Sequence, residues 1–512
     1  MKTTRRSIDS KAVPEPKPVV RKWEVTNSLL RTVLVTSLGS IQYGYILWVV
    51  YSPVLLLEDM GNTAKNPGEQ QYLLFMLGLA ISLFPIGGLT GALIAGVMVD
   101  EYGRKGALLI NCFCSMVSSM FMVCATVVQA FLFTMLSRFI VGITIGIFSI
   151  VVPLYLIEIS PLNMRGAIGM LPHFFLAVGV LLAQLLSFPE MLGNEEDWPI
   201  LTSVPGILAL FQTIVVPSFP ESPRYLLIQK NDEEKAMLAL QKLRHNEDVQ
   251  GEIEELQQEK MAEKTEKSMN SLKLLCFPSL RWQVLSVIIL MCGQQLSGVN
   301  AVYFYTERIY LSTGTDLNNV PYIRVASSVA IIIAVFVGVF YIDSVGRKFL
   351  LLLGFGMCTI LCIVLTMNLE LQGDALWMSY INAFLINIFL MGHAVGPSAL
   401  PNLIIAEIFL QSSRSSAYVV GGFVHWFLNF FSIVTFLNIQ KYIGFFSFLI
   451  CCPICAATFI FILKMIPETT HQTFLEIRKQ LPIYVAQRQI TKMERMPRRN
   501  TRRALGEGQN PV

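Results

Sequence analysis

The sequence predicts an all-α membrane protein in which twelve transmembrane helices form two six-helix bundles joined by a helical linker. Three observations predict this fold: depletion of charge, a series of apolar segments, and an internal repeat. The chain of 512 residues is 54% hydrophobic and 14% charged, whereas soluble domains usually carry about a quarter charged residues. Of its 39 basic and 35 acidic side chains, 28 lie in the 377 residues outside segments 1–31, 221–275 and 464–512. A soluble enzyme does not fit this composition.

Twelve segments are long and apolar enough for membrane helices, which need roughly 20 mainly apolar residues to cross about 30 Å of hydrocarbon. The expected spans are 29–56, 72–99, 107–128, 130–157, 167–189, 200–217, 283–311, 323–342, 350–369, 378–409, 417–439 and 445–466. The corresponding domains are an N-tail (1–28), a first bundle (29–217), a linker (218–282), a second bundle (283–466) and a C-tail (467–512). Leucines at helical spacing (Leu238, Leu240, Leu243, Leu256) predict short helices in the linker.

Lysine and arginine beside the helix ends set the expected orientation, because cytoplasmic loops carry an excess of these residues. The two tails and the loops holding Arg104, Arg165, Arg347 and Arg414 are basic, whereas the alternate loops are mostly acidic. Both termini are therefore predicted to be cytoplasmic. The net charge of +4 is small, and no basic patch interleaves with aromatic residues, so no nucleic-acid partner is expected. Nine of the ten cysteines lie in apolar runs, which argues against a disulfide framework.

The internal repeat relates the short loops of the two halves. Gly103-Arg104-Lys105 recurs as Gly346-Arg347-Lys348, offset by 243 residues. Glu158 and Arg165 recur as Glu407 and Arg414, and Pro220-Glu221-Ser222 is echoed by Pro467-Glu468-Thr469, with offsets of 249 and 247. Similar offsets in the same order predict two parallel six-helix halves.

Carboxylates and arginines in these loops predict a gate, since the two groups can pair bidentately. Ion pairs at the boundary between the halves would close the cytoplasmic side and break when it opens. The alternative is that the arginines serve only as positive-inside anchors.

These motifs, together with Pro220-Glu-Ser-Pro-Arg-Tyr-Leu-Leu227 and Gln294-Gln-Leu-Ser-Gly-Val-Asn300, resemble the facilitative hexose transporters, sugar porters of the major facilitator superfamily. The resemblance runs from about residue 25 to residue 478. Gln42-Tyr43-Gly44-Tyr45, Gly392-His393-Ala394 and His425-Trp426 are most similar to the fructose-transporting branch. The resemblance implies facilitated transport of a hexose, with D-fructose the leading substrate, across the plasma membrane. The predicted gating residues are Arg104, Glu158, Arg165, Glu221, Arg224, Arg347, Glu407, Arg414 and Glu468.

A sugar site requires polar side chains inside the membrane, where they are costly enough to suggest a purpose. Gln294, Gln295, Asn300, Tyr303 and Tyr305 are expected on one membrane helix, and the amides can both donate to and accept from neutral hydroxyls. Hydrogen bonding between helices is the alternative role for each. The resemblance adds Tyr43, His173, His393, His425 and Trp426 to the predicted sugar site.

Departures from the family pattern leave the substrate open. His173 stands where the family has a sugar-binding glutamine, and Ile331 stands where it has an asparagine. The first helix has Ile46 in place of asparagine, and the tenth, Ser398-Ala-Leu-Pro-Asn402, loses a proline and gains an amide. One alternative is transport of another hexose or of an organic solute such as urate. The other alternative is a sensor that binds sugar without moving it.

Residues 29–56 contain no carboxylate to carry a proton, so uniport is favoured over proton coupling. The histidines lack close ligand spacing, and Cys452-Pro-Ile-Cys455 lies inside a membrane helix, so neither a metal, a cofactor nor redox chemistry is predicted. The expected partners are a small sugar and the lipid bilayer. The oligomeric state is not determined by these patterns.

Overall fold

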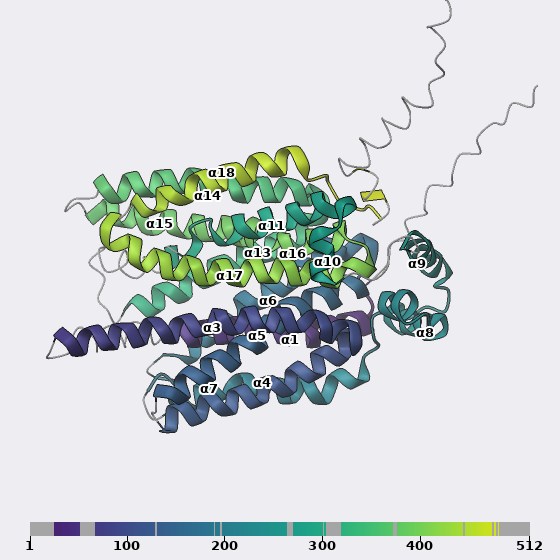
Figure 1. Ribbon diagram of the computed structural model, residues 1–512, viewed down its shortest axis with the longest axis horizontal. Coiled ribbons are helices and arrows are strands. Elements are labelled where there is room, and N and C mark those ends of the chain that lie inside the picture. Colours follow the sequence, from purple (N-terminus) through teal and green to yellow (C-terminus); the bar gives the residue numbers. More distant parts are fainter. Residues whose placement is uncertain are drawn as a thin grey trace, which may run out of the picture.

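The computed structural model describes residues 25–51, 67–128, 131–188, 190–194, 197–263, 270–300, 302–303, 319–371, 376–443, 446–473, 476–477 and 480. Every regular element in these ranges is a helix. Eleven helical spans among the described residues are long and apolar enough to cross a membrane. Figure 1 shows two bundles side by side, the first in purple to blue and the second in green to yellow, with the teal linker helices at one end. We call that end the linker side.

The first bundle follows the predicted spans closely. Its helices are α1 (Asn27–Tyr51), α3 (Pro67–Glu101), α4 (Gly103–Val128), α5 (Phe131–Ile159), α6 (Arg165–Leu186) and α7 (Trp198–Val215). Residues 52–56 of the first predicted span lie outside the described residues. Helix α5 supplies much of the core, since Val151, Leu154 and Leu156 have no exposed surface.

Helices α3 and α5 touch through their backbones. A Cβ atom on Gly87 would lie 2.2 Å from the carbonyl oxygen of Phe139, and one on Gly142 would lie 2.3 Å from that of Phe84. Small residues four apart allow such close approach between membrane helices. The glycines of α3 and α5 therefore let the two backbones lie in direct contact.

The second bundle contains two breaks that the sequence analysis did not foresee. Its helices are α11 (Arg281–Gln295), α13 (Val320–Val345), α14 (Arg347–Leu371), α15 (Leu376–His393), α16 (Leu400–Ile408), α17 (Gln411–Ile443) and α18 (Ser447–Met465). The expected membrane span over 378–409 is present as Trp377–Ile408, but it is not one regular α-helix. A π-helical turn, η6 (Ala394–Ser398), separates α15 from α16 and contains Pro397, which cannot donate a backbone hydrogen bond.

The expectation that five polar residues share one helix is wrong. Helix α11 ends at Gln295 and a turn follows, in which Gly298 has a φ of +92°. A positive φ is readily adopted by glycine and interrupts the helix. Asn300 and Tyr303 therefore lie beyond a break, and Tyr305 lies outside the described residues.

The linker forms the short helices that its leucine spacing predicts. They are α8 (Glu233–Arg244), α9 (Gln250–Glu263) and α10 (Ser271–Cys276), preceded by a π-helical turn, η3 (Tyr225–Gln229). Leu240 and Leu256 pack in a small separate core, whereas Leu238 is exposed. Arg244 ties α8 to the first bundle by donating from Nη1 to the carbonyl oxygen of Ile159 at 3.1 Å.

Gly346 is a position where only glycine fits, because its φ of 98° and ψ of 153° belong to a region that other residues rarely adopt. A Cβ atom there would also lie 2.6 Å from Glu468 Oε2. We expect Gly346→Ala to destabilise the protein by about 1–3 kcal/mol, seen as a lower thermal unfolding midpoint of the purified protein. The control is Gly251→Ala on α9, where a Cβ meets nothing within 4 Å. Equal midpoints for the two variants would contradict the argument.

Candidate functional site

A cavity of about 90 Å³ lies between the two bundles. Helices α1, α5 and α6 line it from the first bundle, and α11, η6, α16 and α17 from the second. The polar side chains facing it are Ser40, Tyr43, Ser149, His173, Gln294, Ser398, Asn402, Tyr418 and His425. None of the described lining residues is Asp, Glu, Lys or Arg. The cavity therefore presents hydroxyl, amide and imidazole groups beside apolar surfaces such as Phe148 and Met291.

Gln294 is the most connected polar residue of the cavity. Its Nε2 donates to the carbonyl oxygen of Ser398 at 3.0 Å, and its Oε1 lies 2.8 Å from Nδ1 of His425. With the proton on Nδ1, His425 donates to this amide oxygen. Gln294 thus joins α11 to η6 and α17, and both ends of its amide are already engaged.

His173 connects the two bundles across the cavity. Its Nδ1 lies 3.3 Å from the hydroxyl oxygen of Ser398, so α6 of the first bundle and η6 of the second share a hydrogen bond. A solute that enters between the bundles would either replace this bond or add to it.

Tyr43 and Trp426 form an aromatic wall. Their ring centroids are 6.1 Å apart, and Trp426 makes an edge contact with Phe84 at 5.8 Å. Trp426 is buried and lies over Gly88, where a Cβ atom would come within 2.4 Å of the indole ring. Trp426 therefore supports Tyr43 from behind, whereas Tyr43 itself faces the cavity.

Besides Trp426, four residues predicted for the site do not line the cavity. Gln295 donates from Nε2 to Oε1 of Gln294 at 3.4 Å and accepts from Asn429 at 3.2 Å. His393 donates from Nε2 to the carbonyl oxygen of Gln294 at 3.2 Å. The other two are Asn300, which donates to Ser432 at 3.0 Å, and Tyr303, which is 59% exposed. Their roles in binding stay predictions.

Ser398 and Asn402 were not predicted as site residues. The tenth predicted segment carries an amide that the family pattern lacks. The side of that segment that faces the cavity could not be assigned while it was treated as one continuous helix. The π-helical turn shifts the helical phase at Pro397. Ser398 and Asn402 consequently both line the cavity.

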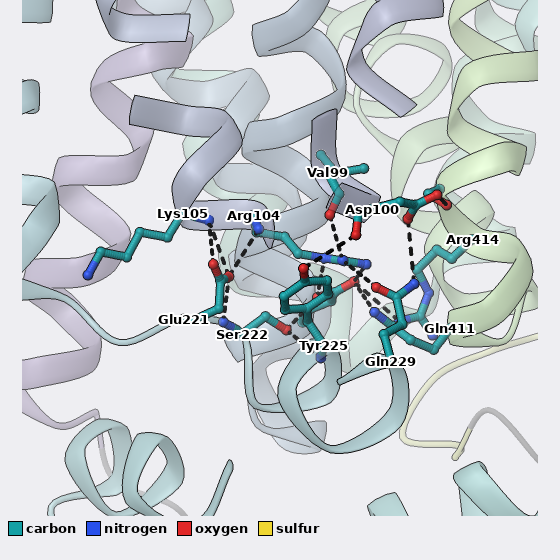
Figure 2. Close-up of polar contacts among 12 residues, drawn as sticks. Val99, Asp100, Arg104, Lys105, Glu221, Ser222, Tyr225, Gln229, Gln411 and Arg414 are labelled. Carbon is teal, nitrogen blue, oxygen red and sulfur yellow. Dashed lines mark hydrogen bonds and ion pairs between the residues drawn. The ribbon is translucent and has the colours of Figure 1, made fainter. Parts of the chain in front are cut away.

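An ion-pair network closes the linker side of the first bundle (Figure 2). Arg104 holds Glu158 bidentately, with Nε 2.8 Å and Nη2 2.9 Å from the two carboxylate oxygens, and both side chains are fully buried. Ser222 donates its hydroxyl to Glu158. Glu221 accepts from the backbone N–H groups of Arg104 and Lys105 at 3.1 Å.

The second bundle repeats this arrangement with the residues that the repeat pairs. Glu468 accepts from the backbone N–H groups of Arg347 and Lys348 at 3.0 and 3.2 Å. Arg347 lies 3.5 Å from Glu407, and Thr469 donates to Glu407 at 2.5 Å. The predicted bidentate carboxylate–arginine pair is present in the first bundle. Its arginine is Arg104 rather than Arg165, which lies seven residues after Glu158.

Contacts between the bundles also gather on the linker side. Arg414 of α17 lies 3.8 Å from Glu158 of α5, and Gln411 donates to the same carboxylate at 2.9 Å. Asp343 of α13 accepts from the backbone N–H of Ala167 on α6 at 3.1 Å. The linker takes part, since Glu259 of α9 pairs with Arg224 and lies 3.5 Å from Arg414. Burial lowers the pKa of Arg224, but Glu259 and its neighbours outweigh that effect and hold this pKa above its ordinary value.

Two contacts join the bundles at the opposite end of the cavity. The Arg324 guanidinium of α13 lies over the Trp48 ring of α1, 5.6 Å from its centroid. Phe188, just after α6, stacks on Tyr322 of α13 with centroids 4.9 Å apart. The cavity therefore lies between two sets of contacts between the bundles.

Two helical bundles around a central cavity are the architecture of a major facilitator transporter. A solved proton:xylose symporter of that superfamily, bound to 6-bromo-6-deoxy-D-glucose, superimposes with a TM-score of 0.78 at 19% identity, covering 90% of this chain and all of the other. A fucose:proton symporter from E. coli superimposes with a TM-score of 0.55 at 13% identity, covering 85% of this chain and 98% of its own.

The sequence comparisons identify the family. The family model "Sugar (and other) transporter" matches residues 32–481. The human facilitated glucose transporter member 5 of solute carrier family 2 is 44% identical over 90% of this chain and 93% of its own length. The mouse member 7 is 40% identical over 92% of this chain and 93% of its own. The chain belongs to the sugar (and other) transporter family. The predicted family, the membrane fold and the non-enzymatic class are confirmed.

Proposed function

We propose that the protein moves a hexose, with D-fructose the leading substrate, across the plasma membrane by facilitated uniport and alternating access. The observation that carries the proposal is the neutral polar cavity between the bundles. Hydroxyls of a monosaccharide both donate and accept, and the amide, imidazole and hydroxyl groups facing this cavity can do the same. The similarity to the human member 5 supports the hexose assignment.

The chemistry of the lining supports uniport. A proton-coupled carrier needs an ionisable carboxylate at membrane depth, and no described residue lining the cavity carries one. The sugar gradient is then the only driving force. We place both termini and the linker on the cytoplasmic side, in agreement with the positions of lysine and arginine.

The predicted site residues take two kinds of role in this proposal. Tyr43, His173, Gln294 and His425 contact the sugar, while Gln295, His393 and Trp426 hold those residues in place. Asn300 and Tyr303 stay predicted members of the sugar site. The ion-pair network on the linker side is the cytoplasmic gate. It breaks when the bundles rock apart and releases the sugar.

Uptake of labelled D-fructose and D-glucose into proteoliposomes tests the proposal, with wild type and His173→Gln compared at pH 7.5 and pH 6. We expect saturable fructose flux in the wild type, equal at the two pH values. His173→Gln restores the residue typical of the family and is expected to keep flux within about threefold, because an amide can replace the bond to Ser398. No fructose or glucose flux in the wild type would overturn the proposal.

His173 also supports a second candidate, transport of another hexose or of an organic solute such as urate. Compared with the glutamine typical of the family, the imidazole of His173 presents its hydrogen-bonding atoms to Ser398 in a different geometry. Flux in His173→Gln but not in the wild type would favour this candidate. Binding of a sugar without any flux would identify a sensor instead.

A further inference from the structure

Helix α10 lies at the linker-side end of the second bundle, just before the chain enters α11 (Figure 1). Leu274 fixes it to the protein, since this side chain has no exposed surface and belongs to the main core. Phe277 has extended backbone angles and Pro278 follows it, so α10 ends before α11 begins at Arg281. The helix is therefore a separate element beside the ends of α11 and α17.

The opposite face of α10 is apolar and exposed. Leu272 is 79% exposed and Leu275 is 47% exposed, and Cys276 is exposed as well. With about 3.6 residues in a helical turn, these three positions share one face and Leu274 lies on the other. Keeping such a face in water costs free energy, and contiguous exposed apolar patches mark contact with a partner or a membrane.

The charges near this face suit a lipid headgroup region. Between Lys267 and Glu307 the chain carries only two charged residues, Lys273 and Arg281, and both are positive. Both are also exposed. Basic side chains beside an apolar surface are attracted to anionic headgroups, while the apolar side chains enter the acyl region. An exposed face with this composition is therefore suited to the surface of a bilayer.

The exposed surface of α11 continues toward α10. Trp282 and Leu285, near the start of α11, are 38% and 39% exposed. Tryptophan is enriched at the boundary between membrane and water, because its ring is apolar and its indole N–H can meet the headgroups. Cys276 precedes Trp282 by six residues. Helix α10 consequently lies close to the level of that boundary.

Helix α8 shows how an exposed leucine is placed on a water-facing helix of the same linker. Leu238 is 58% exposed. Glu234, Lys235 and Lys242 lie one turn away from it on α8, where residues three and four apart are neighbours. Leu238 is thus a single apolar side chain among charges of both signs, whereas the exposed face of α10 has adjacent apolar side chains and no acidic neighbour in sequence.

We infer that α10 is an in-plane membrane anchor, which lies among the headgroups of the leaflet on the linker side and inserts Leu272, Leu275 and Cys276 among the upper acyl-chain carbons. The partner of its exposed face is lipid, not a second protein. Lys273 extends from the side of the helix to the headgroups. The anchor holds the end of the linker at the membrane where α11 begins, whichever solute the protein carries.

Cys276 can report its own surroundings, because it is the one exposed cysteine among the ten. The purified full-length protein is labelled with a fluorophore and placed in nanodiscs of phosphatidylcholine and phosphatidylserine, and Cys276→Ser gives the background from other thiols. Quenching is measured with aqueous iodide and with lipids that carry a nitroxide on the headgroup, high on the acyl chain or near its end. Gly251→Cys on α9, combined with Cys276→Ser, is the water-facing control, since a side chain there meets nothing within 4 Å.

We expect the Cys276 label to be quenched most by the nitroxide high on the acyl chain and least by iodide, and the Gly251→Cys label to be quenched most by iodide. Leu272→Glu combined with Leu275→Glu should lower the ratio of docked to undocked α10 on the order of 10²-fold, because both leucines lose their apolar burial. Quenching at Cys276 then resembles that of the water-facing control. Leu238→Glu on α8 is the matched control and should leave quenching at Cys276 unchanged.

Three results would overturn the inference. Strong iodide quenching at Cys276 in the otherwise unchanged protein would place α10 in water. Protection of the label from iodide and from every nitroxide would show that protein covers the face. Acyl-chain quenching that persists in the double glutamate variant would show that the label inserts without the leucines. If glutamate impairs folding, Leu272→Ser combined with Leu275→Ser replaces it, with the same expected change. Hexose flux plays no part in these measurements, so their outcome is independent of the proposed function.

Discussion

Replacing Arg414 with leucine is expected to shift the resting population toward the state that is open on the linker side. Arg414 lies 3.8 Å from Glu158 in the opposite bundle and 3.5 Å from Glu259 in the linker, and all three side chains are buried. Removing one partner of a buried pair typically costs about 3–5 kcal/mol, which corresponds to a change on the order of 10²- to 10⁴-fold in an equilibrium constant. The cost falls on the closed state, because only that state holds the charges together.

Hydrogen–deuterium exchange followed by mass spectrometry measures this shift in the full-length protein. The linker-side ends of α5, α6, α16 and α17 should exchange faster in Arg414→Leu, and Arg165→Leu should act in the same direction because its charge interacts with Glu407 of the other bundle. The matched control is Arg281→Leu, since Arg281 is exposed and donates to Pro278 three residues away. Unchanged exchange in both Arg414→Leu and Arg165→Leu would refute the gate.

Gln294→Leu is expected to weaken sugar binding and transport about 10- to 100-fold. Leucine fills similar space but removes the contacts with the Ser398 carbonyl and His425, and a buried polar group left without a partner costs about 1–3 kcal/mol. The same change removes an amide from the lining and loosens the link between α11, η6 and α17. Both effects lower the stability of the sugar-bound state.

Fructose flux against concentration in proteoliposomes checks this result, normalised to folded protein. Gln283→Leu is the control: that glutamine lies on the same helix, is buried, and donates to the Ile408 carbonyl at 3.3 Å, but does not line the cavity. It should lower stability and leave KM unchanged. A wild-type KM in Gln294→Leu would show that this amide does not contact the sugar.

Local composition was enough to predict most of the helices. Spans such as 107–128 and 323–342 fall within α4 and α13, because an uninterrupted apolar run has few alternatives to a helix in lipid. The breaks inside the segments 283–311 and 378–409 were missed for the same reason. Hydropathy does not register a backbone break at Gly298 or Pro397, since these residues are common in membrane helices and neighbouring groups can satisfy the freed backbone.

The candidate site could be predicted in part. Tyr43, His173, Gln294 and His425 line the cavity as expected. Asn402 and Ser398 were not assigned because the side of a helix that faces a cavity depends on the phase of the preceding π-helical turn.

The sequence by itself determined the membrane class, the two-half repeat and the residue types available for a gate. Glu158, Glu221, Glu407 and Glu468 were identifiable because duplicated loops keep both residue order and spacing. Only the tertiary structure decided that Glu158 pairs with Arg104 from 54 residues away and reaches Arg414 of the other half. The physical reason is that ion pairs form between side chains close in space, whereas sequence spacing limits contacts only within one helix or loop.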